Sequence, residues 1–176
     1  WLQLYEMGTL MSLDKSTIKN LELTETLFEK KVQGSLLGVL DKTSTAMGGR
    51  KLKQWLKEPL NNVTDINDRL DAVEALTDDF LICKNIKTNL KQIYDFERLS
   101  GRIACGNANG KDLIALRNSC YVLPEIKQDL VDQDSSLLQQ LNDDIHDLHE
   151  VYDLINRAIV DEPPFAIKEG GVIREG

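Results

Sequence analysis

The sequence predicts an all-α fold, an irregular multi-helix bundle in which one or two short strands occur only near the N-terminus. Hydrophobic residues make up 41% of the 176 residues and aromatics only 6%. Glycine and proline are sparse, with 11 and 4 residues. Apolar positions recur every three or four residues over most of the chain, which is the period of a helix with one buried face. A chain of this length buries roughly 70% of its unfolded surface, so it supports a real core.

The first elements are short. Residues 9–13 are typical of an extended piece, and residues 21–23 alternate apolar with polar side chains, which favours a second short strand. Between them, Asp14 is placed to cap a helix that runs through Asn20. The two strands are therefore expected to flank one short helix.

Two helices are predicted next. Residues 35–40 form one or two apolar turns. The hydroxyl side chains of residues 43–45 are placed to cap a longer helix, which continues to about Lys57. Pro59 follows closely, and the residue before a proline is disfavoured in helical conformation. This helix is therefore expected to end at about residue 58.

The stretch from Thr64 shows the clearest helical period, with polar residues away from its apolar stripe. We expect an amphipathic helix with one buried face. Asp79 can cap the following helix. The first stripe contains Ile66, Leu70, Val73 and Leu76, and the second contains Phe80, Cys83, Ile86 and Leu90.

A glycine-rich loop separates two further helices. The first spans about residues 95–105, and Asn109 with Asp112 forms a capping arrangement for the second, over residues 113–122. Pro124 is well placed in the first turn of a successor helix. The sequence therefore predicts a helix boundary just before this proline.

Apolar residues continue at helical spacing over residues 135–159. Two helices, or one long kinked helix, satisfy this pattern. Asp147 and Glu150 resemble a capping box, which favours a break at residues 144–147. The prolines at residues 163–164 are expected to end the last helix.

Charge is unevenly distributed along the chain. The net charge is −8, which argues against a self-sufficient nucleic-acid binder. Residues 1–60 carry nine Lys/Arg against seven Asp/Glu, whereas residues 125–162 carry two against eleven. If DNA lies near this chain, the second stretch should face away from it.

Cysteine usage and the chain ends indicate a reducing, cytoplasmic compartment. The three cysteines, Cys83, Cys105 and Cys120, form no C-x-x-C pair and no disulfide framework. The N-terminus has no signal-peptide pattern, and no apolar run approaches the roughly 20 residues needed to cross a bilayer. The chain starts abruptly at Trp1 and stops at Gly176 without a terminal helix, so we expect a segment of a larger protein.

Three polar clusters resemble functional sites, and each has a simpler explanation. His146 and His149 are three residues apart, not the four of the helical zinc motif, so a solvated helix face is favoured over a metal site. The loop at residues 106–112 is one residue short of a phosphate-binding loop, and Asp112 would repel a phosphate. Four cations surround Trp55 and favour an exposed face over direct phosphate contact: Arg50, Lys51, Lys53 and Lys57. With no nucleophile and base in a suitable pattern, we predict no catalytic, cofactor-binding or metal-ligating residues.

An ordered series of motifs runs from about Leu10 to the last residue. The motifs are M-S-L-D at 11–14, N-L-E-L at 20–23, D-K-T-S-T-A-M-G-G-R-K-L at 41–52, R-L-D-A-V-E at 69–74, D-F-E-R-L at 95–99, D-E-P-P at 161–164 and G-G-V-I at 170–173. In this order the series resembles the core (lever) domain of bacterial MutS-family DNA mismatch repair proteins.

The resemblance implies a division into residues 1–13, the end of a connector segment, and residues 14–176, the N-terminal part of the helical core, truncated before the DNA clamp. It implies a non-catalytic domain that couples the clamp and connector to the ATPase domain. No Walker-type loop and no Phe-x-Glu wedge occur in this sequence. The resemblance therefore implies that ATP, magnesium and mismatched duplex DNA bind to other domains of the parent.

Further expectations come from the resemblance alone. They are a homodimeric parent that is a DNA-dependent ATPase, a MutL-type partner, no membrane, and a cytoplasmic, nucleoid-associated location. On coupling, we expect Asp at Val73 or at Ile155 either to uncouple ATP turnover from mismatch binding or to unfold the domain.

Two rival functions stay open. A free-standing helical adaptor would bind another protein through an exposed apolar groove, and it would have the same composition. A metal-dependent enzyme would use His146 and His149, and metal analysis would test it.

Overall fold

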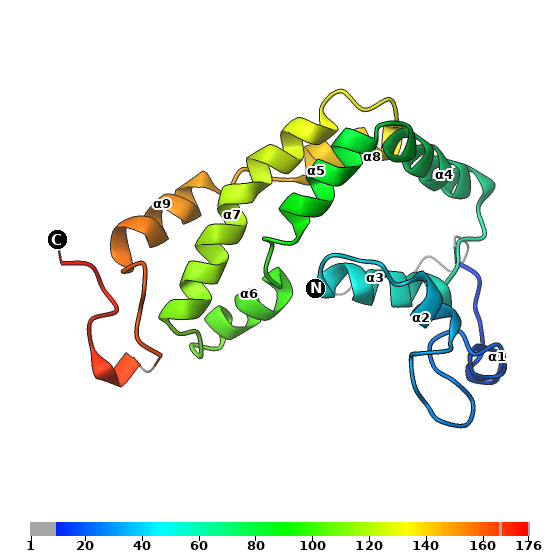
Figure 1. Cartoon of the computed structure of the whole chain (residues 1–176), viewed down its shortest axis with the longest axis horizontal. Helices are drawn as coiled ribbons and strands as arrows, with labels where there is room; N and C mark the ends of the chain where they lie inside the picture. The colour runs from blue at the N-terminus through cyan, green and yellow to red at the C-terminus, as the bar shows by residue number, and fades with distance from the viewer. Residues whose placement is uncertain (1–9, 166, 176) are drawn as a thin grey trace. The chain divides into compact units, whose positions relative to one another are not determined.

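The computed structural model describes residues 10–165 and 167–175, which form nine α-helices and one short 3-10 helix (Figure 1). The chain divides into two compact units, Trp1–Val73 and Glu74–Gly176. The all-α prediction is confirmed: in the described residues, β-structure is limited to two isolated bridges. The first unit holds α1 (Lys15–Asn20), α2 (Leu36–Leu40), α3 (Ala46–Lys57) and most of α4 (Val63–Asp78). The second holds α5 (Phe80–Leu90), α6 (Phe96–Ala104), α7 (Gly110–Leu130), α8 (Ser136–Asp144), α9 (His149–Ala158) and the 3-10 turn Ile167–Glu169.

The strand predicted at residues 9–13 is reduced to a single bridge. Leu10 pairs antiparallel with Leu60, and the Met11 N–H donates to the Pro59 carbonyl at 2.7 Å. Beyond this pair no ladder forms up to Asp14, and residue 9 lies outside the described residues. The predicted division at residue 13 stays a prediction.

The prediction of a second strand at residues 21–23 is wrong. The N–H groups of these three residues donate to carbonyls of α1 at 3.0–3.1 Å. Glu22 also has a φ of 49°, a left-handed conformation that a strand does not contain. Because α1 uses these donors, the segment forms a turn.

Several predicted helix starts are confirmed, and each uses a side-chain oxygen to accept a backbone N–H three residues on. Such a cap stabilises a helix by about 1 kcal/mol. The capping box at the start of α7 is complete, because Asn109 and Asp112 each accept the other's N–H at 2.9 Å. The other predicted caps that form are Asp14, Thr45 and Asp79.

The second unit is built around α7, which is 21 residues long and contacts α5, α6, α8 and α9. Figure 1 shows α9 along one side of α7, with α5 and α6 along the other. At its centre, the fully buried Ser119 hydroxyl donates to the Ala115 carbonyl at 2.8 Å and accepts the Tyr94 N–H at 2.9 Å. Within the described ranges, neither α7 nor another helix is long and apolar enough to cross a membrane.

The boundary predicted before Pro124 is wrong, because α7 continues through this residue to Leu130. An interior proline costs about 3 kcal/mol. However, the buried positions Ser119, Val122, Ile126 and Leu130 follow one continuous stripe across it. Burial of the three aliphatic side chains contributes about 1.5–3 kcal/mol each, so packing outweighs the local penalty.

The predicted break between α8 and α9 is confirmed, but the predicted capping box is not. The N-cap position is Leu148, which makes no side-chain hydrogen bond. Asp147 instead accepts the N–H of His149 at 2.9 Å, two residues on. This local turn uses the carboxylate, so the helix begins one residue later than the box requires.

Helix α9 ends at Ala158, five residues before the prolines that were expected to end it. Ile159 adopts extended backbone and forms an antiparallel bridge with Ile173. Val160 N–H donates to the Val172 carbonyl at 3.1 Å, and Arg174 N–H to that of Ala158 at 2.8 Å. Pairing with residues 172–174, which we call the C-terminal segment, therefore ends the helix.

Candidate functional site

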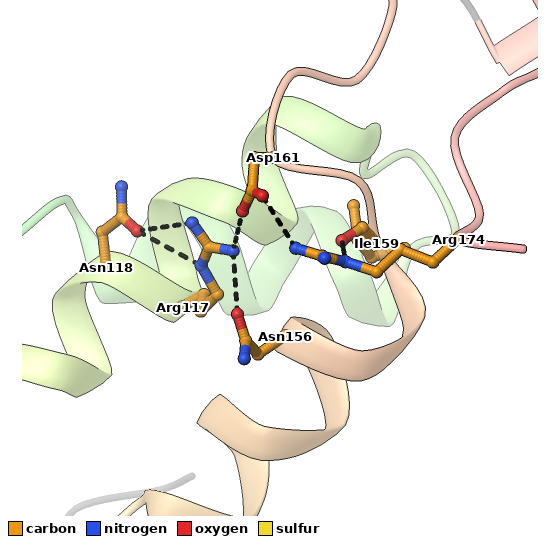
Figure 2. A network of polar contacts seen from close by, with 6 residues as sticks. All are labelled: Arg117, Asn118, Asn156, Ile159, Asp161 and Arg174. Atoms are coloured by element: carbon orange, nitrogen blue, oxygen red, sulfur yellow. Dashed lines mark hydrogen bonds and ion pairs between the residues drawn. The ribbon is translucent and has the colours of Figure 1, made fainter. Parts of the chain in front are cut away.

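A polar network joins α7, α9 and the segment after α9 (Figure 2). Its centre is the Arg117 side chain on α7, which is only 13% exposed. The guanidinium donates to the Asn156 amide oxygen at 3.1 Å and to the Asp161 carboxylate at 2.7 Å. It also contacts the side-chain oxygen of Asn118 at 3.3–3.4 Å. One nearly buried cation thus binds three parts of the unit.

The Asp161 carboxylate links this cation to a second one. Its other oxygen lies 2.9 Å from Arg174, whose Nε donates to the Ile159 carbonyl at 2.7 Å. The hydrogen bond from Arg117 lowers the pKa of Asp161, and the charge of Arg174 lowers it further. The carboxylate is therefore held ionised between two arginines, and it ties the C-terminal segment to α7.

A close backbone contact adds to this attachment. Gly110, the first residue of α7, is buried against the side chains of Pro163 and Val172. A Cβ on Gly110 would lie 2.6 Å from the Pro163 Cβ and 3.1 Å from the Val172 Cγ1. Only glycine fits this approach, so Pro163 and Val172 pack closely on the first residue of α7.

The predicted apolar stripe of α4 is not buried as expected, although Leu76, which lies in the second unit, is half-buried. The side chains of Ile66, Leu70 and Val73 are 38%, 59% and 62% exposed. Ala72, away from this stripe, is the buried residue of the helix. The spacing is amphipathic as predicted, but most of the apolar surface of Leu70 and Val73 is exposed. Aligned exposed apolar side chains are typical of an interaction surface.

The two histidines do not converge on a common point. His146 is exposed in the loop after α8, and His149 lies at the start of α9. The His149 Nε2 is 3.3 Å from the Asp153 carboxylate, and its ring stacks with Tyr152. In residues 10–165 and 167–175, no group of three or more His, Cys, Asp and Glu is arranged to hold a metal. That the histidines are not ligands stays a prediction.

The loop at residues 106–112 connects α6 to α7, as the sequence indicates. Asp112 accepts the Asn109 N–H and pairs with Arg102 at 2.9 Å. Its carboxylate lies at the N-terminus of α7, where a negative charge is stabilised by the helix dipole. The loop's polar side chains thus cap a helix.

The cations of α3 lie mostly on an exposed surface, as expected. Arg50, Lys51 and Lys53 are exposed and Lys57 is half-buried. The sequence did not indicate the partner of Trp55: the Arg69 guanidinium lies 3.9 Å from the centroid of its ring. This cation–π contact, worth about 0.5–1 kcal/mol, joins α4 to α3. Phosphate contact by the α3 cations stays untested.

These features define a helical domain with one long central helix, a firmly attached C-terminal segment and an exposed apolar stripe. The family model described as MutS domain III matches residues 16–175. This chain belongs to that family.

Proteins described as DNA mismatch repair protein MutS are similar to this chain over nearly its whole length. The one from Alkaliphilus oremlandii is 49% identical over 175 residues, which cover 99% of this chain and 20% of that protein. The one from Acetivibrio thermocellus is 46% identical over 172 residues, covering 98% of this chain and 20% of that protein. The chain therefore spans about a fifth of the length of these relatives.

Proposed function

We propose that this chain acts as a non-catalytic domain of a DNA mismatch-recognition ATPase and couples its DNA clamp and connector regions to its ATPase domain. The observation that carries the proposal is the match to MutS domain III over residues 16–175. In this role the chain holds no cofactor itself. ATP and magnesium, and mismatched duplex DNA, bind to other domains.

The proposal extends to the longer protein. It is a homodimer with a MutL-type partner, and it is cytoplasmic and associated with the nucleoid. These properties rest on the similarity to relatives about five times as long as this chain.

The structure supports a coupling role through two features. Coupling requires elements that transmit a displacement without deforming, and contacts that change between states. In the second unit, α7 has a continuous buried stripe, and its Arg117 holds Asp161, which in turn pairs with Arg174. In the first unit, the exposed stripe of α4 is available for a contact with another segment.

The free-standing adaptor is the second candidate, and the same exposed stripe favours it. The two functions differ in what the chain does inside a mismatch repair protein. A coupling domain must support the response of ATP turnover to a mismatch, whereas an adaptor has no reason to do so.

A domain exchange tests the proposal. The 175-residue segment of the Alkaliphilus oremlandii relative that matches this chain, at 49% identity, is replaced by this chain. We expect the chimera to bind mismatched duplex and to change its ATP turnover in response, while the separate 176-residue chain hydrolyses no ATP. ATP hydrolysis by the separate chain, or a folded chimera that binds both ligands without any response, would contradict the proposal.

A further inference from the structure

A hollow of about 300 Å³ lies where α7 passes α9 in the second unit. Its walls are aromatic and acidic. Cys120, which is buried, also lines it. The other lining residues are Tyr121, Pro124, Glu125, Asp147, His149 and Tyr152. We call this hollow the tyrosine pocket.

The aromatic rings of the tyrosine pocket form a connected group. The centroids of Tyr121 and Tyr152 are 5.7 Å apart with an interplanar angle of 35°. The His149 ring is 6.1 Å from Tyr152 and nearly parallel to it, at 14°. Tyr121 is 60% exposed, so it is accessible to an incoming group. The face of a phenol ring is electron-rich and attracts cations.

The charged residues around the pocket also favour binding of a cation. Glu125 and Asp147 are exposed, and no Lys or Arg is among the lining residues. Residues 125–162 carry eleven Asp/Glu and only two Lys/Arg, a net charge of −9. Lys127 donates to the carbonyls of Asn142 and Ile145, and Arg157 donates to that of Asp153. These two cations leave an excess of negative charge in residues 125–162, so the pocket lies in an acidic part of the chain.

We propose that the tyrosine pocket binds an arginine side chain presented by a partner protein with a basic surface segment. A guanidinium is planar, stacks on aromatic rings and can form bidentate hydrogen bonds with a carboxylate. It therefore suits a pocket of tyrosine rings and carboxylates better than an ammonium does. Nucleic acid is the wrong occupant, because the acidic surface repels phosphates. The hollow has the volume of a side-chain site, and the surrounding charge adds long-range attraction for a basic segment.

The first test is an NMR titration of the 176-residue chain with the peptide acetyl-Gly-Arg-Gly-amide. The matched peptide carries citrulline, a neutral analogue of arginine of nearly the same shape. We expect the ring resonances of Tyr121 and Tyr152 to shift with the arginine peptide only, with a Kd on the order of 1 mM. High salt should weaken this binding. Equal shifts with citrulline, or no arginine-dependent shift at concentrations on the order of 10 mM, overturn the proposal.

Two pairs of variants distinguish binding in the tyrosine pocket from non-specific attraction to the acidic surface. Tyr121→Ala should weaken arginine binding about two- to fivefold, the range expected for one exposed cation–π contact. Tyr94→Ala removes a similarly exposed aromatic outside the pocket and should change nothing.

The second pair alters charge. Asp147→Asn should weaken binding, whereas Asp132→Asn removes the same charge from the acidic stretch without touching the pocket and should not. Asn at position 147 can still accept the N–H of His149, so the local turn is kept. If either control weakens binding as much as its matched variant, the proposal is overturned.

Discussion

Replacing Gly110 by alanine tests how tightly the C-terminal segment packs on α7. The added Cβ would lie 2.6 Å from the Pro163 Cβ, closer than real carbon atoms approach, and 3.1 Å from the Val172 Cγ1. Pro163 is buried and its ring is stiff, so the segment must shift. Overpacking of this kind costs about 1–3 kcal/mol. The higher helix propensity of alanine offsets at most about 1 kcal/mol of this cost, and less at the first helical position. We therefore expect a net loss of about 1–2 kcal/mol in the free energy of unfolding.

Urea unfolding followed by circular dichroism measures this loss, and Gly101→Ala is the matched control. Gly101 lies inside α6, and a Cβ there would meet no atom within 4 Å. The control should therefore gain about 0.5–1 kcal/mol. In the Gly110 variant, the amides of Val160 and Arg174 should also exchange hydrogen faster, because the pairing around Ile159 is loosened. A Gly110→Ala protein as stable as the wild type would refute the packing argument.

Three further predictions follow from polar groups. The folded-state pKa of Asp161 is lowered, so its contribution to stability is present above the unfolded pKa of about 4 and is lost as the pH falls through the folded value. The urea midpoints of wild type and Asp161→Asn should therefore differ at neutral pH and converge in acid. Identical midpoints at neutral pH would count against the network. Lys127→Met keeps the apolar stem but removes the donor for two carbonyls at the end of α8, so unfolding should require about 1–3 kcal/mol less; unchanged stability would show that the ammonium does not hold α8. Iodoacetamide should modify the exposed Cys105 well before Cys120, because burial raises the pKa of Cys120 and blocks access; equal rates by mass spectrometry would contradict this burial.

The helix starts could be predicted because their physics is local. A cap needs only a short polar side chain and a backbone N–H three residues later, as at Asp79 and at Asn109. The rule failed at Asp147, where a competing turn uses the same carboxylate. A second local rule, the preference of proline for the first turn of a helix, failed at Pro124, where a long buried face outweighs the local cost of proline.

The polar network and the fate of the α4 stripe could not be predicted in the same way. Arg117 and Asp161 are 44 residues apart, and their contact depends on how α7, α9 and the C-terminal segment pack. The period of residues 66–76 specifies that one face of α4 is apolar. It does not specify what covers that face, and in the described residues it is exposed at Leu70 and Val73.

The measurement that tests the central claim most directly is the mismatch response of ATP turnover in the chimera carrying Val73→Asp. The Val73 side chain is 62% exposed, so the charge should not unfold the domain, whereas Asp at the buried Ile155 should. The isosteric variant Asn67→Asp adds the same charge at an exposed position of α4 outside the stripe. The coupling role predicts that Val73→Asp keeps binding of ATP and mismatched duplex but loses the response, while Asn67→Asp keeps both. A full response in a stably folded Val73→Asp chimera would contradict it.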